Sequence, residues 1–166
     1  MFKELSADEL VMNPFTKIGS EWALLSAGNE ERFNMMTASW GGFGVLWFRN
    51  TITAYIRESR YTRTFFDAND IFTVSFFDER YRGALNVCGT LHGNECDKVK
   101  ESGLTPYFTE GTAAFEEAGL IFICRKMFHA DLTRETADAK EIYDEVYSEP
   151  DIHRMYIGEV LKVLAK

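Results

Sequence analysis

The segment Arg57–Thr62 collects side chains that suit a phosphate group. Its candidate phosphate ligands are Arg57, Ser59, Arg60, Tyr61 and Thr62. Guanidinium groups make strong hydrogen bonds to phosphate oxygens, and hydroxyls and the free N–H groups of a helix N-terminus add further donors. The alternative is an exposed strand end followed by an ordinary helix cap, and spacing alone leaves that alternative somewhat ahead.

A second segment, Asn34–Gly42, suits the edge of a flat ring. Its small and hydroxyl residues Thr37, Ala38 and Ser39 precede Trp40 and two glycines. Glycine lets the backbone approach a ligand closely. Composition by itself favours the plainer interpretation, in which a strand ends in a glycine turn and Trp40 lies in the core. The question is whether the two segments together hold one phosphorylated aromatic ligand.

Other reactive residues indicate structural roles. Cys88, His92 and Cys96 are spaced by four, as zinc ligands on a helix would be. The glycines at 89 and 93 interrupt that helix and a fourth ligand is not evident, so we expect no metal site.

Two histidines also have plainer interpretations. His129 and Asp131 share a strand face, and we interpret them as a structural pair because no nucleophile is spaced to join them. His153 is interpreted as a surface residue after a turn. The chain contains no G-x-S-x-G motif, no P-loop and no carboxylates at catalytic spacing.

The pattern of apolar residues predicts a mainly β protein with short inserted helices, in a β-barrel or sandwich. Predicted strands are 15–18, 21–27, 32–36, 45–48, 51–57, 71–77, 120–132 and 155–163, with a break at Gly41-Gly42 and a turn at Arg49-Asn50. Predicted helices are 62–69 (capped by Ser59 or Thr62), 81–87, 95–101 (capped by Asn94) and 137–147. No linker or repeat divides the chain, so we expect one domain over residues 1–166.

Composition limits the classes of partner. Hydrophobic residues are 46% and aromatic residues 14% of the 166, which is enough for a sizeable core and an aromatic-lined pocket. The formal net charge of −8 opposes binding to nucleic acid and to anionic membranes.

The compartment is predicted from the cysteines and the N-terminus. Three cysteines without close pairing indicate a reducing compartment. The N-terminal residues lack the apolar core of a signal peptide, and no run of about 18 apolar residues predicts a membrane span. We therefore expect a cytoplasmic protein.

Four segments in order resemble the flavin reductase-like family, FMN-binding proteins of the split-barrel fold that includes flavoredoxins. The segments are N-M-M-T-A-S-W-G at Asn34–Gly41, Y-I-R-E-S-R-Y-T at Tyr55–Thr62, L-N-V-C-G-T-L-H-G-N-E-C-D-K at Leu85–Lys98 and H-R-M-Y-I-G-E-V at His153–Val160. The chain departs from the family in the third segment, where a serine and an arginine are replaced within His92–Cys96. Nicotinamide or substrate contacts of those two residues are therefore not carried over.

The resemblance implies a Greek-key split barrel that works as a homodimer with FMN near the interface. It places Arg57, Ser59, Arg60, Tyr61 and Thr62 around the phosphate, and Met36, Thr37, Ala38, Ser39 and Trp40 against the isoalloxazine ring or ribityl chain. It also places Lys98 near the ring and His153 on the nicotinamide side.

By the same resemblance, the chain is an oxidoreductase that passes electrons through FMN. The donor would be NADH, NADPH or a redox partner, and the acceptor free flavin, a ferric chelate or another protein. The flavin would supply the redox chemistry, so no protein nucleophile or base is required. Two alternatives are a non-catalytic FMN store or sensor and a barrel with a vestigial site.

Overall fold

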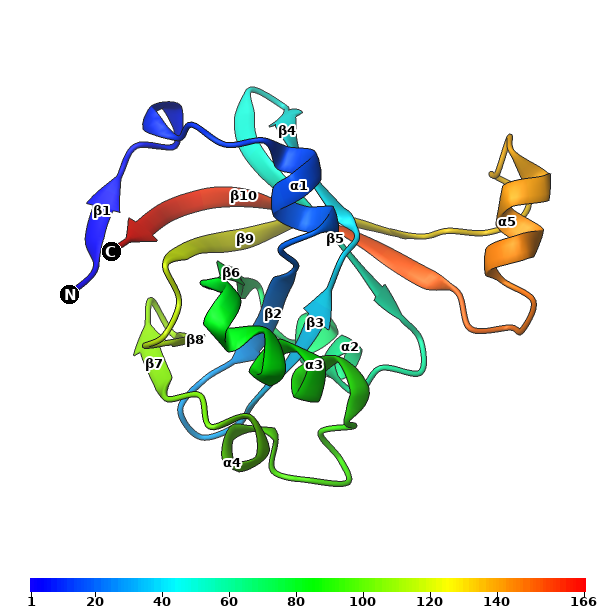
Figure 1. The fold of residues 1–166 in the computed structure, drawn as a ribbon. Coiled ribbons are helices and arrows are strands. Elements are labelled where there is room, and N and C mark those ends of the chain that lie inside the picture. Colours follow the sequence, from blue (N-terminus) through cyan, green and yellow to red (C-terminus); the bar gives the residue numbers. More distant parts are fainter.

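A computed structural model describes residues 1–166, and its main sheet is antiparallel, eight-stranded and strongly curved (Figure 1). The strand order is β3-β2-β6-β9-β10-β5-β4, with β1 paired to the far end of β10. The strands of this sheet are β1 Lys3–Leu5, β2 Ala23–Gly28, β3 Phe33–Ala38, β4 Gly41–Leu46, β5 Arg49–Arg57, β6 Ile71–Phe76, β9 Leu120–Asp131 and β10 His153–Ala165. A separate hairpin is formed by β7 Pro106–Thr109 and β8 Thr112–Phe115. The fold is therefore mainly β, as predicted.

Short helices connect the strands. They are η1 Ala7–Glu9, α1 Pro14–Gly19, α2 Thr62–Ala68, η2 Glu79–Tyr81, α3 Arg82–Thr90, α4 Lys98–Ser102 and α5 Lys140–Val146. In Figure 1, α3 lies over β2 and β3, whereas α5 stands apart from the sheet on the connection between β9 and β10. None of these helices has the length and apolar character needed to span a membrane.

Both faces of the central strands are buried. Leu25 and Phe122 belong to an inner cluster with Phe66 and Phe72, whereas Leu24 and Ile121 pack outward. The outer cluster also contains Leu85 of α3 and Phe115 of β8. Both faces of this part of β9 are therefore covered, the second by α3 and the β7–β8 hairpin.

The predicted strand at Phe15–Ile18 is wrong, because these residues belong to helix α1. The Asn13 side chain accepts hydrogen bonds from the backbone N–H groups of Phe15 (3.0 Å) and Thr16 (3.4 Å). Pro14 occupies the first helical position, where its missing N–H costs nothing. This start signal outweighs the strand preference of the aromatic and β-branched residues that follow.

The predicted break at Gly41-Gly42 is also wrong, since both glycines lie inside β4 and pair with β5. A Cβ atom on Gly41 would lie 2.8 Å from the Thr53 carbonyl oxygen, so glycine permits the close pairing here. The turn occurs at Trp47-Phe48, with φ of 52° and 60°, and not at Arg49-Asn50, which begin β5.

Two helix caps differ from the prediction. Tyr61, and not Ser59 or Thr62, is the N-cap residue of α2, and its side chain makes no capping hydrogen bond. The Ser59 hydroxyl donates to Asp151 instead. Helix α4 begins later than predicted and is capped by Asp97, not Asn94. Its C-cap residue is Gly103, with φ of 69°.

Candidate functional site

One cavity brings the two predicted segments together. This β3–β5 cavity has a volume of about 300 Å³. Its lining residues are Met36, Thr37, Ala38, Ser39, Trp40, Tyr55, Arg57, Arg60, Gly89 and His153. Its lining includes all the predicted ring-contact residues at 36–40, two of the five predicted phosphate residues (Arg57 and Arg60) and His153. Lys98, which was predicted near the ring, does not line it. Their predicted ligand-binding roles remain predictions.

Strand pairing explains the meeting of residues so distant in sequence. Arg57 ends β5, and His153, the first residue of β10, lies directly opposite it in the antiparallel register. Trp40 lies between β3 and β4, and its ring is 4.6 Å from the His153 ring, tilted by 34°. Trp40 is 44% exposed, so the interpretation that buries it in the core is wrong.

The backbone and hydroxyl of Ser59 and the side chain of Arg57 hold a carboxylate. The Ser59 backbone N–H donates to Asp151 Oδ1 at 2.8 Å and its hydroxyl donates to Oδ2 at 2.7 Å. Arg57 Nη1 lies 3.7 Å from Asp151 Oδ2 and donates to the Asp151 carbonyl at 3.2 Å. We call these donors the anion cradle. Asp151 was not singled out from the sequence, because only the connection after β9 brings it there.

The charge of Asp151 is stabilised in the cradle. Burial alone would raise the pKa of its carboxyl group, but the hydrogen bonds from Ser59 and the charge of Arg57 outweigh that effect and lower the pKa. The Arg57 guanidinium also lies 5.6 Å from the centre of the ring of Tyr147. Tyr147 lies on the same connection between β9 and β10 as Asp151. The cradle is therefore built to hold an anion.

Arg60 reaches the cavity from the other side. Its guanidinium donates to the carbonyls of Gly89 (2.8 Å) and Cys88 (3.1 Å), near the C-terminal end of α3. Burial lowers the pKa of Arg60, opposed by the charge of Asp151. Arg60 therefore joins α3 to the cavity and brings positive charge to its wall.

Besides Ser59 of the anion cradle, three predicted residues do not line the cavity: Tyr61, Thr62 and Lys98. The Tyr61 hydroxyl accepts a hydrogen bond from Arg32, and the buried Thr62 hydroxyl accepts one from the Asn34 amide at 3.1 Å. Lys98 is buried, and its ammonium donates to the carbonyls of Met35 (2.8 Å) and Cys88 (3.0 Å). Burial lowers the pKa of Lys98 to about 8. It supports β3 and α3 from behind the cavity wall.

His153 is a buried residue, not the surface histidine that its position after a turn predicted. Its Nδ1 is 2.8 Å from the Tyr147 hydroxyl, and Trp40 covers its ring. Burial and then the positive charge of Arg57 lower the pKa of His153 to about 4. The imidazole is therefore neutral at pH 7 and does not add to the positive charge of the cavity.

The neutral state of His153 predicts a loss of stability in acid. As the pH falls from about 6.5 to about 4, the unfolded chain binds a proton at this residue that the folded chain does not, so the free energy of unfolding decreases. Urea unfolding of the wild type and of His153→Gln across this range measures the effect. We expect the decrease to be smaller in the variant, and an equal decrease in both would contradict the assignment.

Two side chains that the sequence analysis interpreted as a pair have separate partners. Asp131 accepts two hydrogen bonds from Arg154, at 2.7 and 3.0 Å, while the His129 ring lies beside the Tyr156 ring. Among the other candidates, Cys88 is buried in the core and the Cys96 thiol donates to the His92 carbonyl at 3.5 Å. No group of three or more His, Cys, Asp or Glu side chains is placed to hold a metal ion.

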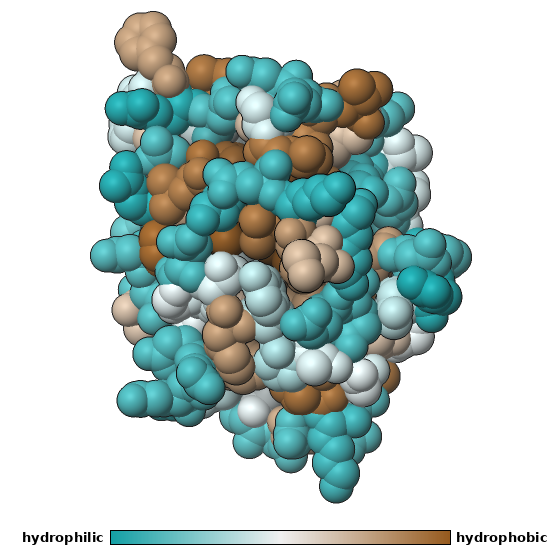
Figure 2. Space-filling model, turned by 90° about the vertical axis from the view of Figure 1, so that its left-hand side faces the viewer, coloured by the Kyte–Doolittle hydropathy of each residue, from teal (hydrophilic) through white to brown (hydrophobic).

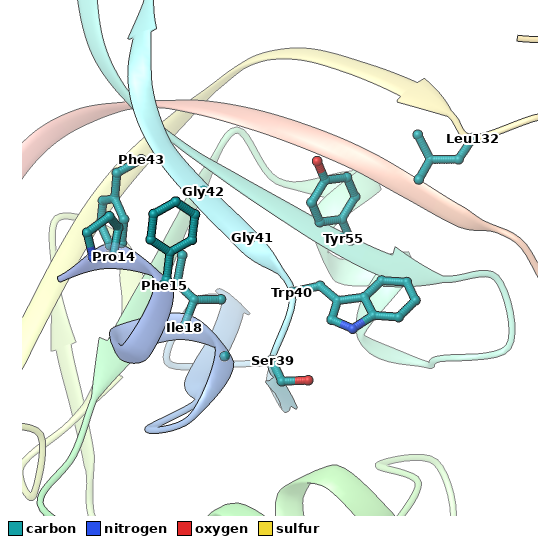
Figure 3. A pocket seen from close by; sticks show the side chains of 11 residues that line it. Pro14, Phe15, Ile18, Ser39, Trp40, Gly41, Gly42, Phe43, Tyr55 and Leu132 are labelled. Atoms are coloured by element: carbon teal, nitrogen blue, oxygen red, sulfur yellow. The ribbon is translucent and has the colours of Figure 1, made fainter. Parts of the chain in front are cut away.

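A second and larger cavity, of about 550 Å³, adjoins the first between α1 and β4 (Figure 3). Ser39, Trp40 and Tyr55 line both cavities. The other lining residues of this α1–β4 cavity are Pro14, Phe15, Ile18, Gly19, Gly41, Gly42, Phe43 and Leu132. Sequence reasoning missed it, because α1 was predicted as a strand. Tyr55 could have been found, since it shares a strand face with Arg57 two residues later.

Comparison of the whole structure with known structures identifies the fold. The chain is similar to an FMN-binding domain of a flavin reductase-like enzyme from Shewanella baltica OS155, with 13% identity, a TM-score of 0.71 and coverage of 99% of this chain and 77% of the other. It is also similar to the flavoredoxin of Desulfovibrio vulgaris (Miyazaki F), with 20% identity, a TM-score of 0.68 and coverage of 99% and 76%.

A third similar structure is an NADH:FAD oxidoreductase of Streptomyces globisporus C-1027, with 15% identity, a TM-score of 0.65 and coverage of 88% and 75%. No protein-family model and no curated protein sequence matches the chain. The chain therefore has the split-barrel fold of FMN-binding, flavin reductase-like proteins. The family resemblance seen in the four sequence segments is confirmed at the level of the fold.

Proposed function

We propose that this protein is an FMN-binding oxidoreductase of the flavin reductase or flavoredoxin type. The observation that carries the proposal is the β3–β5 cavity, in which the backbone of 36–40 and the Trp40 ring adjoin Arg57 and Arg60. A flat ring with a phosphate at the far end of a flexible chain matches that combination. The fold supports it, since the similar structures include FMN-binding proteins and flavoredoxins.

The charge of the cavity suits a phosphorylated ligand. The whole chain carries a net charge of −8, yet no acidic side chain lines the β3–β5 cavity and two arginines do. The neighbouring anion cradle already holds the carboxylate of Asp151 with two hydrogen bonds from Ser59. Charge-assisted hydrogen bonds of this kind are among the strongest that proteins make to phosphate. Arg57 and Ser59 would therefore hold the phosphate.

The ring-binding role falls to the end of β3. In this proposal Met36, Thr37, Ala38, Ser39 and Trp40 contact the isoalloxazine ring or the ribityl chain. The Thr37 hydroxyl already donates to the Leu85 carbonyl at 2.5 Å, so Thr37 contributes mainly its backbone and shape. FMN supplies the redox chemistry when bound, while the chain binds and orients it.

A homodimer is part of the proposal, and exposed apolar residues support it. At the tip of the β4–β5 hairpin, Val45, Trp47 and Phe48 have exposed fractions of 71%, 61% and 100%. Figure 2 shows further apolar side chains gathered on the upper half of the face that carries β1 and β10. A groove there is lined by Leu10, Met12 and Val160. Surfaces of this kind are typical of protein–protein contacts.

The electron donor and acceptor follow from the resemblance. We propose NADH or NADPH as the donor, a choice supported by the similarity to an NADH:FAD oxidoreductase. Free flavin, a ferric chelate or a protein would accept the electrons, and His153 would lie on the nicotinamide side. The proposed location is the cytoplasm.

Flavin titration followed by steady-state kinetics tests the proposal. We expect the purified protein to quench FMN fluorescence on binding, and to oxidise NADH or NADPH in the presence of added flavin. FMN binding without NAD(P)H oxidation, with every tested acceptor, would instead indicate a flavin store or sensor. Absence of FMN binding would refute both functions.

A further inference from the structure

We propose that Trp40, His153 and Tyr147 form an electron-transfer chain that leads out of the β3–β5 cavity. In this chain Tyr147 gives an electron to an oxidised Trp40 while its phenolic proton moves to His153. The biological meaning rests on the proposed function, because FMN in the cavity would be the group that exchanges electrons with Trp40. The transfer among the three side chains is argued and tested without flavin.

The chain begins at the cavity wall. Trp40 lines the β3–β5 cavity and is 44% exposed, so its indole ring is open to an oxidant in the cavity. Figure 3 shows this ring projecting from the short connection between β3 and β4. Tryptophan and tyrosine are the aromatic side chains that a one-electron oxidant attacks most readily. Trp40 is therefore the entry point of the chain.

The three rings are in direct contact. The Trp40 and His153 rings are 4.6 Å apart and tilted by 34°. The His153 and Tyr147 rings are 5.7 Å apart, and the Tyr147 hydroxyl is 2.8 Å from His153 Nδ1. Such separations are those of packed aromatic rings. His153 therefore bridges Trp40 and Tyr147, which favours electron transfer because electronic coupling falls steeply with distance.

The hydrogen bond to His153 provides for the proton. Oxidation turns a phenol into a very strong acid, so tyrosine is oxidised readily only where a base accepts its proton. A base must lie within hydrogen-bond reach of the group that it deprotonates, and His153 Nδ1 lies 2.8 Å from the Tyr147 hydroxyl.

The protonation state of His153 suits this role. The imidazole is neutral at pH 7, because burial and the charge of Arg57 lower its pKa to about 4. The tautomer with its proton on Nε2 leaves Nδ1 to accept from Tyr147. The low pKa makes His153 a weak base, but an oxidised phenol is a much stronger acid than imidazolium. The proton therefore moves from Tyr147 to His153 when the phenol is oxidised.

The step is balanced within the chain. Trp40, after losing one electron to a one-electron oxidant, takes one electron from Tyr147 and is restored. If Trp40 has meanwhile lost its indole proton to water, it takes a proton back from water. Tyr147 loses one electron and its phenolic proton and becomes a neutral phenoxyl radical, and His153 gains that proton and becomes an imidazolium.

The far end of the chain lies on the connection between β9 and β10. Tyr147 follows α5, which stands apart from the sheet in Figure 1. The Tyr143 ring packs 4.6 Å from the Tyr147 ring, and both tyrosines are half-buried. An oxidising equivalent that enters at Trp40 therefore moves from the cavity wall to this connection.

Tyr55 provides the matched control. It lines the same cavity as Trp40, so it is another tyrosine at the entry point. Of the tyrosines, however, only Tyr147 is hydrogen-bonded to a histidine. Tyr147→Phe and Tyr55→Phe each remove one hydroxyl and keep the ring, and thermal melting checks that both variants fold.

Pulse radiolysis of the flavin-free protein, with azide radicals as the oxidant, tests the chain. The parent protein carries Trp22→Phe and Trp47→Phe, so that Trp40 is its only tryptophan. We expect the absorption of the Trp40 radical to decay as that of a tyrosyl radical grows, more slowly in D2O than in water. The transfer should be at least about tenfold slower in Tyr147→Phe and in His153→Gln, which lack the donor and the base. Tyr55→Phe should match the parent.

The inference would be overturned by a Trp40 radical that decays without forming a tyrosyl radical, or by a folded Tyr147→Phe that transfers as fast as the parent. Transfer lost in Tyr55→Phe and kept in Tyr147→Phe would assign the donor to Tyr55 instead. An unchanged rate in His153→Gln, with no effect of D2O, would exclude His153 as the proton acceptor. Failure of FMN to bind would refute the proposed function and leave these measurements unaffected, because they use no flavin.

Discussion

Arg57→Ala is expected to weaken FMN binding about 100-fold, or about 2.7 kcal/mol, because the proposed phosphate contact loses its charged, hydrogen-bonding partner. Riboflavin has the same ring and ribityl chain but no phosphate, so its affinity should change little. Fluorescence titration of both flavins gives the ratio of the two dissociation constants. That ratio isolates the phosphate from the ring.

The matched control for this experiment is Arg49→Ala. Arg49 is the first residue of the same strand and pairs with Glu159, so the variant loses one positive charge far from the cavity. We expect it to bind FMN like the wild type. An Arg57→Ala protein that binds FMN with unchanged affinity would rule out the phosphate assignment.

Asp151→Asn is expected to have the opposite effect and to tighten FMN binding about tenfold. The Asp151 carboxylate occupies the donors of Ser59 that a phosphate would need, and its negative charge repels the ligand. Asparagine has nearly the same shape and can still accept from the Ser59 backbone, so the fold is retained. A weaker internal competitor leaves the cradle open for a larger fraction of the time.

Asp144→Asn serves as the control for Asp151→Asn. Asp144 lies on α5 of the same connection and pairs with Arg134 on the surface, so the change of net charge is identical. Its FMN and riboflavin affinities should equal those of the wild type. If Asp151→Asn weakened FMN binding instead, Asp151 would be a support that shapes the cradle and not a competitor for it.

Much of this fold could be predicted from the sequence, because its strands are locally consistent. Residues 51–57, 71–77 and 120–132 combine β-branched and aromatic side chains, and each corresponds to a strand in the structure. The errors arose where one local sequence signal outweighed another. The cap of Asn13 and Pro14 made a helix of 14–19, and the close pairing of Gly41 with β5 kept the glycines inside a strand.

Residue types alone marked two candidate ligand segments, Asn34–Gly42 and Arg57–Thr62, but left their plainer interpretations ahead, and the family resemblance assigned residues 36–40 to the ring and the residues around Arg57 to the phosphate. Their chemistry is carried by side chains that are adjacent in sequence. Residue types did not reveal that the side chains of Tyr61, Thr62 and Lys98 lie outside the cavity. Their side chains find partners in Arg32, in Asn34 and in the carbonyls of Met35 and Cys88, which only the fold brings near.

The sequence by itself therefore determined the class of fold and the presence of an aromatic segment and an arginine-rich segment, since periodicity and residue type are local properties. Only the tertiary structure decided that the two segments share one cavity, because the pairing of β5 with β10 sets Arg57 opposite His153 and brings His153 against Trp40. It also decided that Asp151 occupies the anion cradle and that a second, uncharged cavity adjoins the first. Such contacts depend on long-range strand pairing, which leaves no pattern in a single sequence.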